Sequence, residues 1–481
     1  MRGGRLAGPA ALVLLPLCAC EPIAPTVGPP TLSPDATIPA VIRATWTAEV
    51  GTTTWLEIGL DGELVRTTAA NSVPETTVLG LKAGRLYAAR AVAENEAGLR
   101  SWSEEVTWTT AAAPAQLPAF TVSDADPTAW GAEGPFLVPV LQASATFVTF
   151  IDRDGDYVWW ETIEPGFIMP SVRITADRRH VLYEVNDVTY THPDAGVHVV
   201  ALDGSERSFT SAPLVHHDGI DLPDGRVAWL EHEERELVDE DGTLQWTSGD
   251  VLMEAEPGAA AGSAERVFSW LDDWGHLPWP GCTHMQETPY DGRSFDWTHT
   301  NSLGYDAASD DYLLLSHHTD ALVRIDRDAG APVWQLGGRF GEFTDVAGDV
   351  IDPDQSWKVD GPAGTWWSHG HIGEFWEGGF ALFDNGPHHV RPVSRAVVYQ
   401  YNEAEKTVEQ TFSFESENES FSPALGDVRR LPNGNWLVVW SLEGMLTEVT
   451  PEGRVVWRVR SELGSALLRS GYLESAEMVG E

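Results

Sequence analysis

Histidine is the residue type that points most clearly to chemistry in this sequence. Five of its fifteen histidines lie between Asp296 and Asn385, and His388 and His389 follow directly. They occur in the segments DWTHTN, LLLSHHTD and SHGHIGEFW, each beside an apolar run that is typical of a β-strand. An imidazole can act as a nucleophile, exchange a proton near neutral pH or bind a transition metal. These histidines are therefore the first candidates for an active site.

The strands that would position the histidines belong to two repeated themes. The first is a strand, a turn with Asp-Gly or a similar pair, and a strand that ends in tryptophan. Its instances are IDRDGDYVWW at 151–160, LVDEDGTLQW at 237–246, IDRDAGAPVW at 325–334 and VTPEGRVVWRV at 449–459. The second runs LPDGRVAWL at 222–230, EGGFALF at 377–383 and LPNGNWLVVW at 431–440. Units that cannot bury their apolar faces alone, repeated in this order, predict an all-β chain with a six-bladed β-propeller, although five or seven blades also fit.

The histidines recur at one place in successive units of the predicted propeller. They stand at 216–217 before LPDG, at 299 in DWTHTN, at 317–318 before the RID turn, and at 369 and 371 before EGGFALF. The strand before each such turn starts near the central channel, so equivalent positions converge there. A single histidine at a strand end is more often structural, but four equivalent positions favour a site. Trp366, Trp367 and Trp376 flank the last pair and could stack on an aromatic ligand, although Trp376 fits core packing equally well.

The N-terminal region divides into shorter segments. Residues 1–19 contain two arginines, an apolar run and the sequence LCA before Cys20, which resembles a bacterial lipoprotein signal with lipidation of the Cys20 thiol. Residues 20–36 are rich in proline and threonine and predict a flexible tether. Residues 37–111 alternate short strands with turns and resemble a fibronectin type III β-sandwich, with Tyr87 as its tyrosine corner. A linker at 112–119 then precedes the propeller domain at 120–475.

These segments predict an exported bacterial lipoprotein of the outer membrane, facing the periplasm or the cell surface. The N-terminal lipid would be its only link to the membrane, because no later segment approaches the roughly 20 apolar residues of a membrane span. After cleavage, Cys20 and Cys282 would be the remaining cysteines. With Cys20 lipidated, no disulfide could form within the chain.

The charge of the chain limits its partners. Thirty basic and 73 acidic residues give a formal net charge of −43, which repels nucleic acid and anionic lipid surfaces. We therefore expect no nucleic-acid partner. An anionic substrate would need a locally basic site, which screening over about 8 Å at physiological salt allows.

A series of segments resembles the arylsulfotransferase family, in the same order along the chain. The segments are HHDGIDLPDG, DWTHTNSLGYD, LVRIDRDAGAPVWQLGG, HGHIGEFWEGGFALFDNG, SRAVVYQY and GDVRRLPNGNWLV, and the resemblance covers roughly 136–473. It implies a bacterial periplasmic or secreted propeller that moves a sulfuryl group from an aryl sulfate to a phenol through a sulfated histidine. It implies no cofactor and no phosphoadenosine-type donor.

The resemblance also implies roles for single residues. His371 matches the nucleophile, with His369 as the alternative because the segments differ in length by one residue. His299 and His217 match two further active-site histidines. The family pattern has an arginine after a serine, ahead of the RID-like turn, that helps to bind the sulfuryl oxygens. Here Ser316 is followed by His317 and His318, so His317 takes that role only if it carries a proton.

Further residues beside these histidines are candidates for substrate binding. They are His369, His318, Asn301 and Trp367. In the expected reaction a neutral His371 attacks sulfur, His299 donates a proton as an imidazolium, and His217 and His317 supply further positive charge.

The same cluster supports a second class of function. His217, His299, His317 and His371 could bind Zn²⁺, Cu²⁺ or Fe²⁺, with Asp218 and Asp296 nearby. The protein would then be a metal-dependent hydrolase or a non-catalytic binding or adhesion lipoprotein. A purely structural propeller is the third alternative.

Two insertions and the C-terminal tail complete the sequence-based expectations. Residues 251–295 and 341–367 interrupt the repeats and predict an ordered lid over the channel. Cys282 and His284 in the first insertion are too isolated to indicate a metal site, and we expect them to pack. The spacing of apolar residues at 461–473 predicts a helix against the ring.

Overall fold

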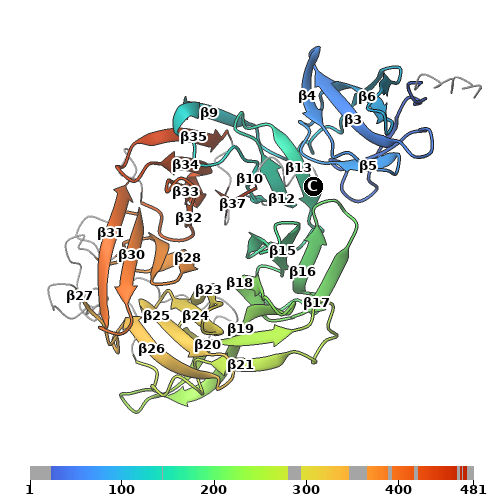
Figure 1. The fold of residues 1–481 in the computed structure, drawn as a ribbon. Coiled ribbons are helices and arrows are strands. Elements are labelled where there is room, and N and C mark those ends of the chain that lie inside the picture. Colours follow the sequence, from blue (N-terminus) through green and yellow to red (C-terminus); the bar gives the residue numbers. More distant parts are fainter. Residues whose placement is uncertain are drawn as a thin grey trace, which may run out of the picture. The chain divides into compact units, whose positions relative to one another are not determined.

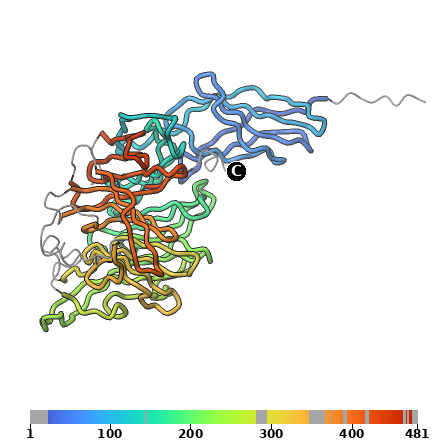
Figure 2. The backbone as a smooth tube through the Cα atoms, turned by 60° about the vertical axis from the view of Figure 1, so that its left-hand side comes forward, coloured from blue at the N-terminus to red at the C-terminus, as the bar shows by residue number. Residues whose placement is uncertain are grey.

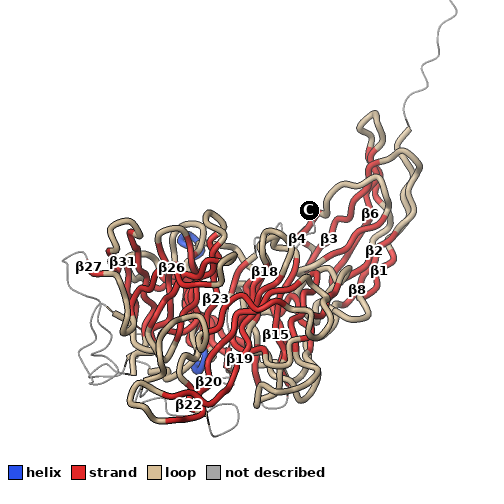
Figure 3. The backbone as a smooth tube through the Cα atoms, turned by 90° about the horizontal axis from the view of Figure 1, so that it is seen from below, coloured by secondary structure: helices blue, strands red, loops and turns tan. Residues whose placement is uncertain are grey.

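The computed structural model describes an all-β protein. It describes residues 23–142, 145–279, 294–345, 366–387, 393–415, 421–462, 466–467 and 470–473. Within these residues the helices are the short 3₁₀ turns Pro127–Ala129 and Ser441–Glu443, and strands and loops make up the rest (Figure 3). A search of the same residues for a helix able to cross a membrane finds none.

Six sheets form a ring, and we number them as blades one to six in chain order (Figure 1). Blade one contains β10 (Phe136–Leu137), β11 (Val140–Gln142), β12 (Ala145–Ile151), β13 (Tyr157–Thr162), β36 (Ala466–Leu467) and β37 (Gly471–Tyr472). Blade two contains β14 (Val172–Ile174), β15 (His180–Val185), β16 (Gly196–Ala201) and β17 (Arg207–Ser211). Blade three contains β18 (Val215–Asp221), β19 (Val227–Val238), β20 (Leu244–Ala255), β21 (Glu265–Ser269) and β22 (Phe295–Asp296).

Blade four contains β23 (Thr300–Asp306), β24 (Asp311–Ser316), β25 (Ala321–Asp326) and β26 (Ala331–Gly337). Blade five contains β28 (Gly370–Trp376), β29 (Gly379–Asp384), β30 (Arg395–Asn402), β31 (Thr407–Glu415) and β27 (Thr344–Asp345). Blade six contains β32 (Asp427–Arg430), β33 (Trp436–Trp440), β34 (Met445–Val449), β35 (Val455–Ser461) and β9 (Phe120–Ala125). The predicted six-bladed β-propeller is therefore confirmed.

The two sequence themes correspond to two hairpins of a blade. LPDGRVAWL and LPNGNWLVVW hold the turns between the innermost strand and the next one, β18–β19 and β32–β33. Three of the four tryptophan-ending segments hold the outermost turns, whereas LVDEDGTLQW is the middle turn of blade three, between β19 and β20. Gly225 and Gly453 in these turns have φ values of 91° and 84°, which glycine adopts without strain. The repeated Gly therefore reflects turn geometry.

Burial along a strand follows its place in the blade. β24 is buried at all six positions, because its two faces pack against neighbouring blades. β31 is the fourth strand of blade five counted from the inner strand β28. Its residues mostly alternate between half-buried and exposed. Continuous apolar runs thus mark the middle of a blade and alternating runs its outside.

The ring is closed at both ends of the propeller chain. The N-terminal strand β9 pairs with β35 of blade six, while the C-terminal strands β36 and β37 pair with β11 and β10 of blade one. Figure 1 shows β37 beside β10, and in Figure 2 the red C-terminal part of the tube lies next to the teal part. The helix predicted for 461–473 is wrong, because the open edges of β10 and β11 offer backbone partners that a helix would leave unpaired.

The first predicted insertion is shorter than expected. β20 and β21 occupy 251–255 and 265–269, so these residues belong to blade three. Of the residues predicted to form the lid, 280–293 and 346–365 lie outside the described residues, as do Cys282 and His284.

The N-terminal sheets fit the predicted β-sandwich. One sheet contains β1 (Thr31–Pro34), β2 (Ile42–Thr45) and β5 (Glu75–Val78). The other contains β3 (Thr53–Leu60), β4 (Glu63–Thr67), β6 (Leu86–Glu94), β7 (Arg100–Trp102) and β8 (Val106–Thr109). The Tyr87 hydroxyl accepts a hydrogen bond from the Lys82 N–H at 3.0 Å, as expected of a tyrosine corner. β1 lies inside the segment predicted as a tether and pairs with β2, so this sheet begins before residue 37.

Trp457 joins the last blade to the first. Its fully buried indole stacks on Phe136 of β10 with ring centroids 4.9 Å apart, and its Nε1 donates to the Arg153 carbonyl at 3.0 Å. We expect Trp457→Ala to lower the free energy of unfolding by about 3–5 kcal/mol, because it opens a cavity at the seam of the ring. Urea denaturation followed by circular dichroism measures this loss.

Leu442→Ala is the matched control for that substitution. Leu442 lies in the same blade but is 44% exposed, so its loss should change the free energy of unfolding by no more than about 0.5 kcal/mol. Equal stability of the Trp457 and Leu442 variants would contradict the role of the seam.

Candidate active site

The histidines predicted to converge lie together at the inner strands of blades three to five. His216 and His217 are in β18, His299 precedes β23, and His317 and His318 follow β24. His369 directly precedes β28, and His371 is its second residue. Figure 1 shows β18, β23 and β28 around the centre of the ring. The structure therefore brings together every histidine that the sequence placed at the channel. We call these seven residues the histidine cluster.

The rings of the cluster form a continuous set of contacts. His217 lies 4.6 Å from His299 and 6.3 Å from His371, measured between ring centroids. His318 stacks on His299 at 4.7 Å, and His317 lies 4.8 Å from His369 and 5.8 Å from His371. A substrate atom in this space would meet imidazoles from three blades.

Three histidines of the cluster have a left-handed backbone. The φ values are 58° at His217, 47° at His299 and 54° at His369. This conformation is uncommon for residues other than glycine, and such residues gather at functional sites. It supports a role for His369 beside that of His371.

Two buried carboxylates position the cluster. Asp296 Oδ2 lies 2.6 Å from Nδ1 of His299. Asp250, which is 1% exposed, accepts hydrogen bonds from the Thr298 hydroxyl and the Thr300 N–H, both at 2.6 Å, and lies 3.3 Å from Nε2 of His216. Asp250 thus holds both ends of the turn that carries His299.

Electrostatics divide the histidines into two kinds. Burial and the neighbouring imidazoles, first among them His299, lower the pKa of His217 well below its usual range. Burial and His369 do the same to the pKa of His317. Burial opposes protonation of His299 too, but the Asp296 carboxylate raises the pKa of that residue. These directions disfavour the positive charge expected on His217 and His317 and favour His299 as an imidazolium.

His317, His318 and His369 form a tighter group inside the cluster. One ring nitrogen from each lies within 4.8 Å of the others. Asp296, His299 and His318 form a second group of this kind. The metal-binding set expected from the sequence, with His217 and His371 in it, is not the set that converges most closely among the described residues.

Two of the candidate substrate-binding residues, Asn301 and Trp367, are buried and contact other parts of the protein. Asn301 is fully buried, and its Nδ2 donates to the Gly370 carbonyl at 3.0 Å, so it joins β23 to β28. Trp367 is 2% exposed and packs edge-on against Phe380 and Tyr399 in the core. The expected stacking of Trp367 on an aryl ring is therefore wrong.

The other two tryptophans beside the cluster also pack against protein rings. Trp366 stacks on Tyr399 at 5.5 Å, and Trp376 lies 6.0 Å from Trp436. Hydrophobic packing between blades accounts for these positions.

Two channel arginines lie close to the cluster along the inner strands. Arg173 Nη2 contacts Asp218 Oδ2 at 2.5 Å and donates to the Leu303 carbonyl at 2.6 Å. Arg429 Nε contacts Asp427 Oδ2 at 3.0 Å. Each guanidinium is thus paired with a buried carboxylate. Neither takes the place of the arginine that the resemblance leads us to expect, where the structure has His317.

Several residues that complete the site carry no obvious signal in the sequence. Asp250 is 49 residues before His299, and Asp320 accepts the His369 N–H at 2.6 Å. Tyr190 stacks on His217 at 6.1 Å. Only the spacing of Asp296 and His299 in DWTH could have indicated an Asp–His pair.

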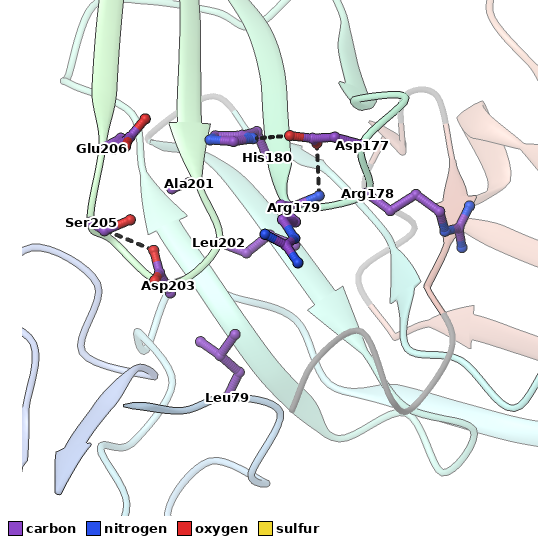
Figure 4. Close-up of a pocket in the computed structure, with 10 residues that line it drawn as sticks. All are labelled: Leu79, Asp177, Arg178, Arg179, His180, Ala201, Leu202, Asp203, Ser205 and Glu206. Atoms are coloured by element: carbon purple, nitrogen blue, oxygen red, sulfur yellow. Dashed lines mark hydrogen bonds and ion pairs between the residues drawn. The ribbon is translucent and has the colours of Figure 1, made fainter. Parts of the chain in front are cut away.

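A separate cavity of about 460 Å³ lies in blade two, at the turns Asp177–His180 and Ala201–Glu206 (Figure 4). His180 Nδ1 contacts Asp177 Oδ2 at 2.8 Å, and Asp203 accepts the Ser205 N–H at 2.8 Å. These partners are turn contacts, and His180 belongs to none of the three groups of converging ligands found among the described residues. The histidine cluster remains the stronger candidate.

Three other predicted positions cannot be compared with the structure. Cys20, His388 and His389 lie outside the described residues.

Comparisons with known proteins agree with the motifs. A family model described as Arylsulfotransferase (ASST) matches residues 122–466. No curated protein matches the chain.

Solved structures are similar in part. A Bacteroides caccae protein of unknown function is 14% identical, with a TM-score of 0.41, over 71% of this chain and 99% of that one. The β-propeller domain of Cps50 (Swd1) from Myceliophteria thermophila is 12% identical, with a TM-score of 0.36, over 66% of this chain and 82% of that one. A human fibronectin type-III domain is 19% identical, with a TM-score of 0.18, over 20% of this chain and 96% of that one.

The role of Asp250 in holding the site can be tested by Asp250→Asn. The amide is a weaker acceptor for the buried donors of Thr298 and Thr300, so the free energy of unfolding should fall by about 1–3 kcal/mol at pH 7. These partners and His216 overcome the effect of burial and lower the pKa of Asp250 to about 2. Stability from a lowered carboxyl pKa is lost on acidification, so the difference between the proteins should shrink as the pH falls below about 4.

Urea denaturation of both proteins between pH 3 and pH 7 checks this expectation. Asp194→Asn, at an exposed turn of blade two, serves as the control and should match the wild type. An Asp250 variant as stable as that control would show that the carboxylate does not hold the turn.

Proposed function

Because the chain belongs to the arylsulfotransferase family, we propose that it transfers a sulfuryl group from an aryl sulfate to a phenol through a sulfohistidine intermediate. Membership rests on the match over residues 122–466. The single observation that carries the mechanism is the convergence of seven histidines at the inner strands of the ring.

His371 is the proposed nucleophile. A nitrogen of its neutral imidazole forms a bond to sulfur as the bond from sulfur to the aryl oxygen breaks. The acceptor phenol then gives its proton to His299, which the first step leaves neutral, and forms the new sulfur–oxygen bond as the bond from sulfur to His371 breaks, which frees the histidine and gives ping-pong kinetics. His371 is 4% exposed and faces His217 and His317, whereas His369 is fully buried. This difference in exposure favours His371 over His369.

His299 is the proposed acid. Its Nδ1 contacts Asp296, so its Nε2 is left to donate a proton to the departing aryl oxygen or a hydrogen bond to a sulfuryl oxygen. The side chain of His299 is 18% exposed, compared with 5% for His318 and 0% for His216. This greater exposure suits a group that contacts substrate. Asp296 acts on the reaction through His299 and is a positioning residue.

The donor is an anion in a strongly acidic protein, so local charge decides binding. The imidazolium of His299 supplies one positive charge at the site. His217 lies 4.6 Å from it, and an arriving sulfate would favour protonation of His217 as well. This arrangement supports a monoanionic aryl sulfate as donor.

Substitution of the nucleophile tests the function. His371→Ala should lower the rate of transfer from 4-nitrophenyl sulfate to phenol by at least about 10³-fold, because the covalent route is lost. His180→Ala, in a turn of blade two, is the matched control and should retain the wild-type rate. Full activity of the His371 variant would refute its role, and selective loss in His369→Ala would assign the nucleophile to that residue.

We also propose that the chain is exported and lipidated at Cys20, as LCAC suggests. Acyl chains bind a bilayer by about 0.8 kcal/mol per buried CH₂ group, so Cys20→Ala should move the protein from the membrane fraction to the aqueous fraction of expressing bacteria. Cys282→Ala retains the proposed anchor and is the control. A wild-type protein found in the aqueous fraction would contradict the proposal.

A further inference from the structure

His317, His318 and His369 each bring one ring nitrogen close to those of the other two. These nitrogens lie within 4.8 Å of one another, and the ring centroids are 4.8–5.8 Å apart. Imidazoles bind zinc at about 2.0–2.1 Å, which places the nitrogens of a tetrahedral site about 3.3–3.4 Å apart. Small side-chain rotations would close the present arrangement to that distance.

A hydrogen bond selects the nitrogen of His318 that would bind a metal. His317 Nδ1 lies 3.0 Å from the Gly370 carbonyl, and His318 Nδ1 lies 2.8 Å from the Asp296 carbonyl. A carbonyl oxygen only accepts, so Nδ1 of His318 carries the proton and its Nε2 carries the lone pair, whereas Nδ1 of His317 also lies 3.1 Å from the donor Nδ2 of Asn301. Metal-binding histidines almost always donate their other ring nitrogen in this way.

A second observation in favour of a bound cation concerns the Nε2 atom of His318. It is buried and makes no hydrogen bond to any described residue. Leaving a buried polar atom unsatisfied costs about 1–3 kcal/mol, so such atoms in a native protein call for a partner. A cation at the meeting point of the three rings would supply one.

The backbone holds the three ligands in place. The His369 N–H donates to Asp320 Oδ1 at 2.6 Å, which ties the start of β28 to the turn that carries His317 and His318. Within that turn the Thr319 hydroxyl donates to Ser316 Oγ at 2.6 Å. Ligands fixed before binding lose little conformational entropy when the metal arrives.

We propose that His317, His318 and His369 bind one divalent transition-metal cation, and that the cation holds the sulfuryl oxygens in place of the arginine expected at His317. Three imidazoles suit Zn²⁺ or Cu²⁺ better than Mg²⁺ or Ca²⁺, which prefer oxygen ligands. Three protein ligands also leave a fourth position open for a substrate oxygen. His371 and His217 remain outside the set and available for transfer.

The metal site stands on the geometry of the three histidines alone, whereas its role as an anion clamp rests on the proposed sulfuryl transfer. Arg173 and Arg429 are already paired with Asp218 and Asp427, so neither offers the unshared charge that the family arginine would bring. A bound cation beside His299 would restore that charge without a proton.

Calorimetric titration of the chelator-treated full chain with ZnCl₂ tests the site. We expect one Zn²⁺ per chain for the wild type and for His180→Ala. His318→Ala and His369→Gln should each lower the affinity by at least the 10–100-fold that removal of an outer partner costs. Zinc should also raise the midpoint of thermal unfolding of the wild type but not that of the variants, which separates lost binding from lost folding. Equal zinc affinity in all four proteins would overturn the metal site.

Transfer from 4-nitrophenyl sulfate to phenol, measured on the same preparations, tests the clamp. Transfer that falls on metal removal and returns with one equivalent of ZnCl₂ supports it. Transfer that is unchanged by metal removal overturns the clamp and leaves the proposed function standing. Stoichiometric zinc with no transfer in either state contradicts the proposed function and leaves the metal site standing.

Discussion

The site depends on one electrostatic constraint: seven imidazoles are packed ring against ring with few carboxylates to balance their protons. Asp296 contacts His299, and Asp250 contacts His216. Each further proton would be placed close to other imidazoles in a buried space, so the pKa values of His217 and His317 are lowered. Protonation is therefore favoured at His299 and disfavoured at His217 and His317. Neutral rings can attack sulfur or bind a metal, and the imidazolium can bind the anion.

The propeller produces this arrangement because its inner strands begin at the channel. β18, β23 and β28 belong to three different sheets, and each carries or follows a histidine with a left-handed backbone. Contacts between blades hold the strands in register: Asp250 of blade three binds the turn before β23, and Asn301 of blade four binds the backbone of β28. Closure by β9, β36 and β37 prevents the blades from separating. The chemistry thus depends on a seam far along the chain from the histidines.

Short sequence patterns predict those features that depend on residues close together in the chain, such as turns, strands and strand ends. Turn glycines and apolar runs identified the hairpins, and the repeated place of the histidines identified the channel. Asp250 and Asp320 could not be found in this way, because only the pairing of distant strands brings them to the cluster. The position of Trp367 near His369 suggests that it stacks on an aryl ring, but its side chain is buried in the core against Phe380 and Tyr399. The tail at 461–473 has helical spacing, yet the open edges of blade one select strands.

The central claim is that a histidine of the channel carries the sulfuryl group between donor and acceptor. The most direct measurement is peptide mapping by mass spectrometry after the protein is mixed with 4-nitrophenyl sulfate in the absence of a phenolic acceptor. The account predicts one sulfuryl group per chain on His371, removed when phenol is added. No covalent addition, or addition at a residue outside the histidine cluster, would contradict it.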